Sequence, residues 1–104
     1  MKKQYDVKHH AQHIFETDLD GFFNWLAVTG KAGSALYDYF DDTQNYKNTR
    51  LVNILVKRNK WKKYIFNALE KGHEKTWALL EGYAQKMHDS AQEDFEIERY
   101  EQNN

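Results

Sequence analysis

The residues with the clearest chemistry are seven Lys or Arg side chains between Thr43 and Leu69, a stretch without Asp or Glu. They are Lys47, Arg50, Lys57, Arg58, Lys60, Lys62 and Lys63. Such a group can neutralise phosphates and release their counterions, and the interleaved Trp61 and Tyr64 can stack on bases. The stretch therefore indicates a surface that binds a polyanion, for which nucleic acid is one source.

A helix must position these cations, and its geometry decides which of them share a face. At 100° per residue, one face of a helix over 49–71 is apolar. It holds Leu51, Ile54, Leu55, Ile65, Phe66 and Leu69. A straight helix would place Arg58 and Lys62 on the same face, where they would have to snorkel or pair with a carboxylate. We favour instead a break near Asn59 that divides the stretch into two helices.

With that break the two helices run over about 49–57 and 60–71, and a helix-turn-helix arrangement becomes possible. The turn lacks the glycine that is usual there. Trp61 is expected in the core and not in contact with a partner. The side chains expected to bind are Lys47, Arg50, Lys57, Lys60, Lys63 and Tyr64.

The acidic end of the chain offers another interpretation of the basic stretch. Its carboxylates are Glu93, Asp94, Glu96, Glu98 and Glu101. The basic and acidic segments could meet within one fold or between two subunits. A homodimer could accordingly form by this pairing or through a helix over 74–98.

A short histidine cluster is the candidate metal site. His9 and His13 are one helical turn apart, and Glu16 follows three residues later. Two imidazoles at i and i+4 have the spacing that binds Zn²⁺ or Ni²⁺ on a helix. A metal site needs further ligands, and His10 points away from this face. An exposed polar face is the simpler interpretation, and we expect no cofactor.

Other motifs do not indicate catalysis, and we expect a protein that is not an enzyme. The segment 30–34 (GKAGS) lacks a Ser or Thr directly after its Lys, so it does not match a phosphate-binding loop. Glu70 and His73 have the spacing of a di-iron half-motif, but Gly72 interrupts it and no second copy exists. The Asp residues are scattered among predicted helix ends and loops, where capping explains them.

Composition excludes several classes of protein. The chain has 104 residues, enough for one domain with a modest core, and a net charge of only −1. It has no Cys, which excludes disulfides and thiolate metal sites. No apolar run approaches the ~18 residues of a membrane helix. The start lacks the apolar region of a signal peptide, so we expect a cytoplasmic protein.

Helices are expected throughout, since Pro is absent and good helix formers are common. Asp6 is a candidate N-cap for a helix that ends near Thr17. The segment 18–21 predicts a turn or kink, with Asp20 as the cap of a second helix. Gly30 is a candidate for the residue that ends this second helix.

The second half of the chain predicts a longer element. Ser34 is a candidate N-cap of a third short helix, which would lead into a loop over 41–45. Gly72 predicts the end of the basic stretch, and a long helix follows over about 74–98. Its apolar stripe consists of Trp77, Leu80, Ala84, Met87, Ala91 and Phe95, with Leu79, Tyr83 and Ile97 off the stripe.

These patterns together predict an all-α domain over 1–104: an irregular bundle of four to five helices with a long C-terminal helix and frayed ends at 1–4 and 99–104. The expected function is non-enzymatic binding or regulation. In the leading version the basic segment 47–63, with Leu79 and Tyr83, docks on a macromolecular partner, which we expect to be a protein. The chain would then be an inhibitor or accessory factor of a nucleic-acid-handling machine. Direct binding of DNA or RNA through 47–63 is the alternative, and no membrane partner is expected.

Overall fold

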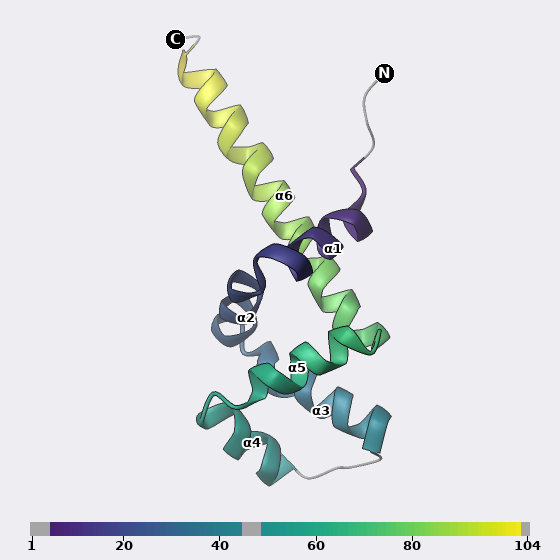
Figure 1. Cartoon of the computed structure of the whole chain (residues 1–104). Coiled ribbons are helices and arrows are strands. Elements are labelled where there is room, and N and C mark those ends of the chain that lie inside the picture. The colour runs from purple at the N-terminus through teal and green to yellow at the C-terminus, as the bar shows by residue number, and fades with distance from the viewer. Residues whose placement is uncertain (1–4, 45–48, 103–104) are drawn as a thin grey trace.

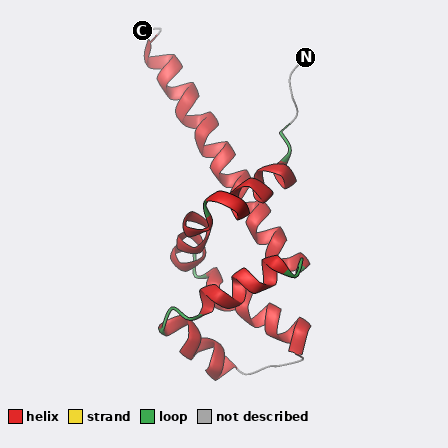
Figure 2. Cartoon of the chain, viewed as in Figure 1, coloured by secondary structure: helices red, strands yellow, loops and turns green. Residues whose placement is uncertain are grey.

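The computed structural model describes residues 5–44 and 49–102, and side chains over 5–43 and 49–91. These residues form six helices and no strand (Figures 1 and 2). The helices are α1 (Val7–Thr17), α2 (Leu19–Val28), α3 (Lys31–Gln44), α4 (Thr49–Lys57), α5 (Trp61–Glu70) and α6 (Glu74–Gln102). The predicted all-α class is confirmed, but the predicted number of four to five helices is too low. Both candidate breaks, at 18–21 and near Asn59, are true helix ends.

Local signals define three helix ends as predicted. The Asp6 side chain caps α1, since its Oδ1 accepts a 3.1 Å hydrogen bond from the amide of His9. Gly30 after α2 has a φ of 73°, and Gly72 after α5 has a φ of 76°. Glycine adopts this left-handed conformation without the steric cost that a Cβ imposes, so both residues end their helices.

Two predicted N-caps are wrong. α2 begins at Leu19, so Asp20 lies in its first turn and not before it. α3 begins at Lys31, three residues before Ser34, and this earlier start buries Ala32. The first turns pack against the core, and this packing outweighs the local preference of Asp and Ser for a cap position.

α3 also extends through part of the predicted loop over 41–45. It reaches Gln44, and the hydroxyl of Thr43 donates a 2.7 Å hydrogen bond to the carbonyl of Tyr39 one turn earlier. This bond satisfies the hydroxyl within the helix, so a polar residue does not end it. Asn45, the last residue of the predicted loop, lies outside the described residues.

Buried side chains from all six helices form one hydrophobic cluster. Its largest fully buried apolar members are Trp61, Phe22, Leu26, Leu36, Ile65, Leu69 and Leu80. Trp61 is 1% exposed, which confirms the prediction that it lies in the core. Its ring packs edge-on against Phe23 of α2 with 5.7 Å between centroids, so aromatic contacts join α2 to α5.

α6 is the longest helix and runs to Gln102, past its predicted end near 98. Its apolar stripe is fully buried at Leu80 and Ala84, whereas Met87 is 47% exposed. Beyond that point α6 leaves the other helices and projects, which gives the molecule its extents of 56 × 28 × 19 Å (Figure 1). In the described part of the chain, no helix is both long and apolar enough to cross a membrane.

Tyr83 lies off the apolar stripe of α6. Its side chain nevertheless packs inside the fold, against α2. Its ring centroid is 5.9 Å from that of Phe22 and 5.6 Å from that of Trp25, both in α2. Its hydroxyl approaches Gly21 so closely that a Cβ there would clash with it. Burial and, less strongly, the charge of Asp18 raise the pKa of Tyr83. Tyr83 is therefore a core contact, with 8% of its surface exposed.

Candidate binding surface

A three-residue turn, Arg58–Lys60, divides the basic stretch into α4 and α5. Asn59 has a φ of 56°, a left-handed conformation that Asn tolerates better than most residues with a side chain. The amide of Lys60 donates to the carbonyl of Leu55 over 2.9 Å, and the amide of Asn59 donates to Val56 over 3.1 Å. These two bonds are the Schellman pattern that closes a helix. The predicted break near Asn59 is thereby confirmed.

Six cations lie on α4, the turn and α5, and we call them the basic surface. They are Arg50, Lys57, Arg58, Lys60, Lys62 and Lys63. All six are exposed, including Arg58 and Lys62, which a straight helix would have placed on its apolar face. Within residues 5–43 and 49–91, none of the six forms an ion pair with a carboxylate. The positive charge of the basic surface is therefore not neutralised by carboxylates of these described residues.

Charge is segregated along the described chain. Residues 49–71 carry seven Lys or Arg and one Glu, a net charge of +6. Residues 5–43 carry two Lys and seven Asp or Glu, a net charge of −5. Figure 1 shows α4 and the C-terminal end of α6 at opposite ends of the molecule. The fold therefore separates α4 from the acidic end of its own α6. Of the two predicted ways in which the basic and acidic segments could meet, pairing between two subunits remains for α4.

The interleaved aromatic side chains offer little open ring surface. Trp61 is buried, and Tyr64 is half-buried with its ring edge-on to Phe40 of α3, 5.1 Å between centroids. The Nζ atom of Lys63 also lies 5.2 Å from the centre of the Tyr64 ring. Stacking of bases, which needs an accessible ring face, is therefore not favoured here. Lys47, another predicted binding residue, lies outside the described residues.

Two apolar side chains lie exposed close to these cations in the sequence. Ile54 of α4 and Phe66 of α5 are each 39% exposed. Ile54 shares a face of α4 with Arg50 and Lys57, since these residues are three or four positions apart. The ring of Phe66 stacks on Phe15 of α1 with 5.8 Å between centroids. An apolar centre with a charged rim is typical of protein–protein interfaces.

The candidate metal residues His9, His13 and Glu16 are all exposed on α1. Oε1 of Glu16 accepts a 3.0 Å hydrogen bond from Gln12, and Nδ1 of His10 is bonded to the hydroxyl of Tyr5. Among the described side chains, no group of three or more His, Asp or Glu is arranged to hold a metal ion. His9 and His13 have the helical spacing of two metal ligands, but the described side chains place no further ligand beside them.

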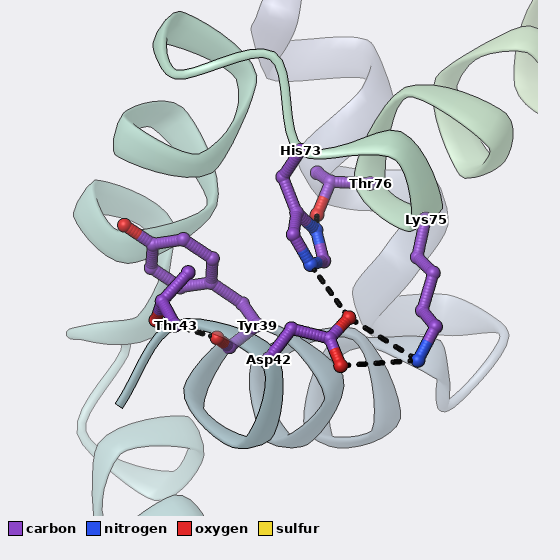
Figure 3. Close-up of polar contacts among 6 residues, drawn as sticks. All are labelled: Tyr39, Asp42, Thr43, His73, Lys75 and Thr76. Atoms are coloured by element: carbon purple, nitrogen blue, oxygen red, sulfur yellow. Dashed lines mark hydrogen bonds and ion pairs between the residues drawn. The ribbon is translucent and has the colours of Figure 1, made fainter. Parts of the chain in front are cut away.

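A polar cluster that the sequence did not predict ties α3 to the junction of α5 and α6 (Figure 3). Nε2 of His73 lies 3.0 Å from Oδ2 of Asp42, and its Nδ1 lies 2.8 Å from Oγ1 of Thr76. Because a carboxylate only accepts, Nε2 donates to Asp42, and in the neutral ring Nδ1 then accepts from the hydroxyl of Thr76. Nζ of Lys75 contacts both oxygens of Asp42, at 3.3 and 3.2 Å.

The electrostatics of this cluster centre on one carboxylate. The hydrogen bond from His73, followed by that from Lys75, lowers the pKa of Asp42 below its usual value of 3.8. The bond to Asp42 in turn raises the pKa of Lys75 above 10.5. Asp, His and a hydroxyl in this order resemble a catalytic triad, but Thr76 is 1% exposed and its hydroxyl cannot meet a substrate. The cluster therefore fastens helices together.

Two hollows flank α3. One of about 440 Å³ lies between α3 and α4, and one of about 410 Å³ lies between α3 and α6. Ser34 and Asp38 line both, and the off-stripe Leu79 lines the second. Among the described residues, Asp38 is the one carboxylate in either lining, and Lys31 and Lys75 also line the second hollow.

The described residues thus present one charged surface and one internal polar tie. The basic surface is exposed, whereas the Asp42–His73 cluster is largely enclosed at its His73 end, where the side chain is 10% exposed. Comparison with protein-family models, curated proteins and solved structures found no match for this chain.

Proposed function

We propose that this chain is a non-enzymatic helical binding module that docks on an anionic macromolecule through the basic surface. The observation that supports this most directly is the exposure of six cations on two helices joined by one tight turn. No carboxylate within residues 5–43 or 49–91 pairs with them. Because two backbone hydrogen bonds hold the turn, the helix backbones that carry the cations are ordered before a partner arrives, which lowers the cost of binding.

Nucleic acid is the partner that this surface fits best. Phosphates supply dense negative charge, and each Lys or Arg that neutralises one releases a counterion. Residues 5–43 carry the opposite charge, with a net of −5. The chain therefore approaches a polyanion in one orientation, with α4 and α5 foremost.

An acidic protein surface is the second candidate, and the exposure of Ile54 and Phe66 favours it. Apolar side chains contribute little to contacts with phosphates, but they commonly form the centre of a protein interface. In this version the chain is a regulator, an inhibitor or accessory factor of a machine that handles nucleic acid.

Fluorescence anisotropy with labelled DNA and RNA at about 50 mM salt tests the first candidate. The double substitution Lys57→Glu with Lys60→Glu is expected to weaken binding by about 100-fold, because two attractive contacts become repulsive. Lys8→Glu with Lys86→Glu makes the same change in net charge at exposed sites on α1 and α6. That control is expected to change the affinity by less than about threefold.

The absence of binding to any nucleic acid at micromolar protein would contradict the first candidate and leave the second. A protein partner would then lose affinity on Ile54→Ser as strongly as on Lys57→Glu, since the centre of a protein interface carries most of its energy. Insensitivity to Ile54→Ser would contradict the second candidate.

Self-association is a further property that the projecting part of α6 supports (Figure 1). Two copies could pair along 74–98, or the acidic end of one could meet the basic surface of the other. Light scattering over a range of concentrations tests both versions. Glu96→Lys with Glu98→Lys is expected to weaken a dimer of the second kind, and a monomer at the highest concentration would contradict both.

A further inference from the structure

α3, α4 and α5 form a unit in which two helices rest on a third. A Cβ placed on Gly33 of α3 would lie 3.9 Å from a methyl of Val56 and 4.0 Å from one of Val52, so α4 packs closely on this part of α3. Phe40, further along α3, meets Tyr64 of α5 at 5.1 Å between centroids. Because α4 and α5 both pack on α3, their outer faces point away from it.

The connection between α4 and α5 has the form of a helix-turn-helix turn. Such turns are three or four residues long and often contain glycine. Here three residues connect the helices, and Asn59 takes the left-handed conformation for which glycine is usual. The missing glycine in the sequence is thus replaced by an Asn in the same conformation.

The outer face of α5 is polar except for Phe66, whose ring stacks on Phe15 of α1. Its exposed side chains are Lys62, Lys63, Phe66, Asn67 and Glu70. Their spacing of i, i+1, i+4, i+5 and i+8 places them on one side of the helix. Asp20 of α2 lines a hollow of about 320 Å³ beside Lys62. By helical spacing Lys63 and Asn67 lie on the other flank, away from Asp20, and Glu70 follows on this flank one turn after Asn67.

We propose that α4 and α5 act as a helix-turn-helix unit that places α5 in the major groove of B-form DNA. This inference rests on the proposed function and names the partner of the same surface. Lys63 and Asn67 of α5 face the base edges, where Lys pairs with guanine and Asn with adenine. Arg50 and Lys57 on the outer face of α4 contact the phosphates beside the groove.

The geometry selects duplex DNA over the other nucleic acids. An α-helix with its side chains is about 10–12 Å across, and the major groove of B-form DNA is about 12 Å wide. The major groove of an RNA duplex is too deep and narrow for side chains to read. Proteins that hold single strands use accessible aromatic rings, whereas Trp61 is buried and Tyr64 is half-buried against Phe40.

Three probes of the same sequence test the choice of partner. They are a DNA duplex of about 20 base pairs, the matching RNA duplex and one strand of the DNA. The DNA duplex is expected to bind at least about tenfold more tightly than either of the others. Equal affinity for the three, or tighter binding of RNA or of the single strand, would overturn this inference while leaving the proposed function intact. No binding to any of them would overturn this inference together with the nucleic-acid version of the proposed function, and would leave the version with an acidic protein partner.

Variants on the two helices test the division of roles. Selection from a pool of randomised duplexes is expected to yield a preferred sequence. Asn67→Ala and Lys63→Ala are each expected to relax that preference by about tenfold at one base pair. Arg50→Ala is expected to weaken binding to all duplexes alike and to reduce the salt slope by about 1. Lys86→Ala on α6 is the control, which is expected to change neither the sequence preference nor the affinity and its salt slope.

Circular dichroism separates these effects from loss of fold, since the four substituted side chains are all exposed. Helical content and melting temperature are expected to stay near those of the unsubstituted chain. A pool that yields no preferred sequence, or a preference that survives both α5 substitutions, would overturn the assignment of α5 to the groove. The salt-dependent binding itself would remain to support the proposed function.

Discussion

The imidazole of His73 and the carboxylate of Asp42 meet at 3.0 Å although 31 residues separate them in the chain. Asp42 lies near the end of α3, and His73 directly precedes α6. The pair therefore fastens the helix beneath the basic surface to the start of the longest helix (Figure 3). A second polar contact joins α5 to α6, since Nε1 of Trp77 donates a 2.8 Å hydrogen bond to the carbonyl of Leu69.

Asp42→Asn is expected to destabilise the fold near neutral pH but not in strong acid. The pKa of Asp42 in the folded state is below its usual value of 3.8. Its carboxylate therefore contributes stability above that usual value, and the contribution is lost as the pH falls through the lowered pKa. Urea unfolding of both chains from about pH 7 to about pH 2 measures the difference. A difference that stays constant over this range would contradict the role of the carboxylate.

Asn59→Gly and Asn59→Ala are expected to have opposite effects on the free energy of unfolding. Ala at a φ of 56° costs about 1 kcal/mol, because its Cβ crowds the neighbouring carbonyl. Gly relieves this crowding and is expected to be neutral or slightly stabilising. Asn53→Ala, at an exposed position within α4, is the matched control and should stay within about 0.5 kcal/mol. Equal destabilisation by Ala and Gly at 59 would show that the turn does not depend on this conformation.

Gly21→Ala is expected to destabilise the fold by about 1–3 kcal/mol, because its Cβ would clash with the hydroxyl of Tyr83. Gly82→Ala on the exposed side of α6 meets no neighbour and should stabilise by about 0.5–1 kcal/mol. Thermal and urea unfolding measure both changes.

Tyr83→Phe provides the internal check on the first of these effects. Removing the hydroxyl removes the atom that the new Cβ would meet, so Gly21→Ala should cost less in the Tyr83→Phe background. If the cost of Gly21→Ala is the same in both backgrounds, the close approach of α2 to Tyr83 is not its cause.

Helix ends that depend on one or two adjacent residues could be predicted from the sequence. Asp6 as an N-cap, Gly30 and Gly72 as end residues and the break near Asn59 follow from local conformational preferences. Ser34 shows where this reasoning fails. It has the chemistry of an N-cap, but the helix starts three residues earlier because Ala32 packs into the core.

The basic surface could be predicted in composition but not in shape. The seven cations are visible in the sequence, whereas their grouping depends on how α5 turns relative to α4 at Asn59. A straight helix would have placed Arg58 and Lys62 inside, and both are exposed. The Asp42–His73 pair could not be predicted at all, since it requires the packing of α3 beside the start of α6 and leaves no local pattern.

The most direct test of the account is the salt dependence of duplex DNA binding by the intact chain. Between about 50 and 200 mM salt, log K is expected to fall linearly with log salt, with a slope of about −3 to −5 for up to six neutralised phosphates. Lys57→Glu with Lys60→Glu should weaken this binding by about 100-fold, whereas Lys8→Glu with Lys86→Glu should change it by less than about threefold. No binding at the lower salt, or the same loss from both pairs of substitutions, would contradict the claim that α4 and α5 carry the function.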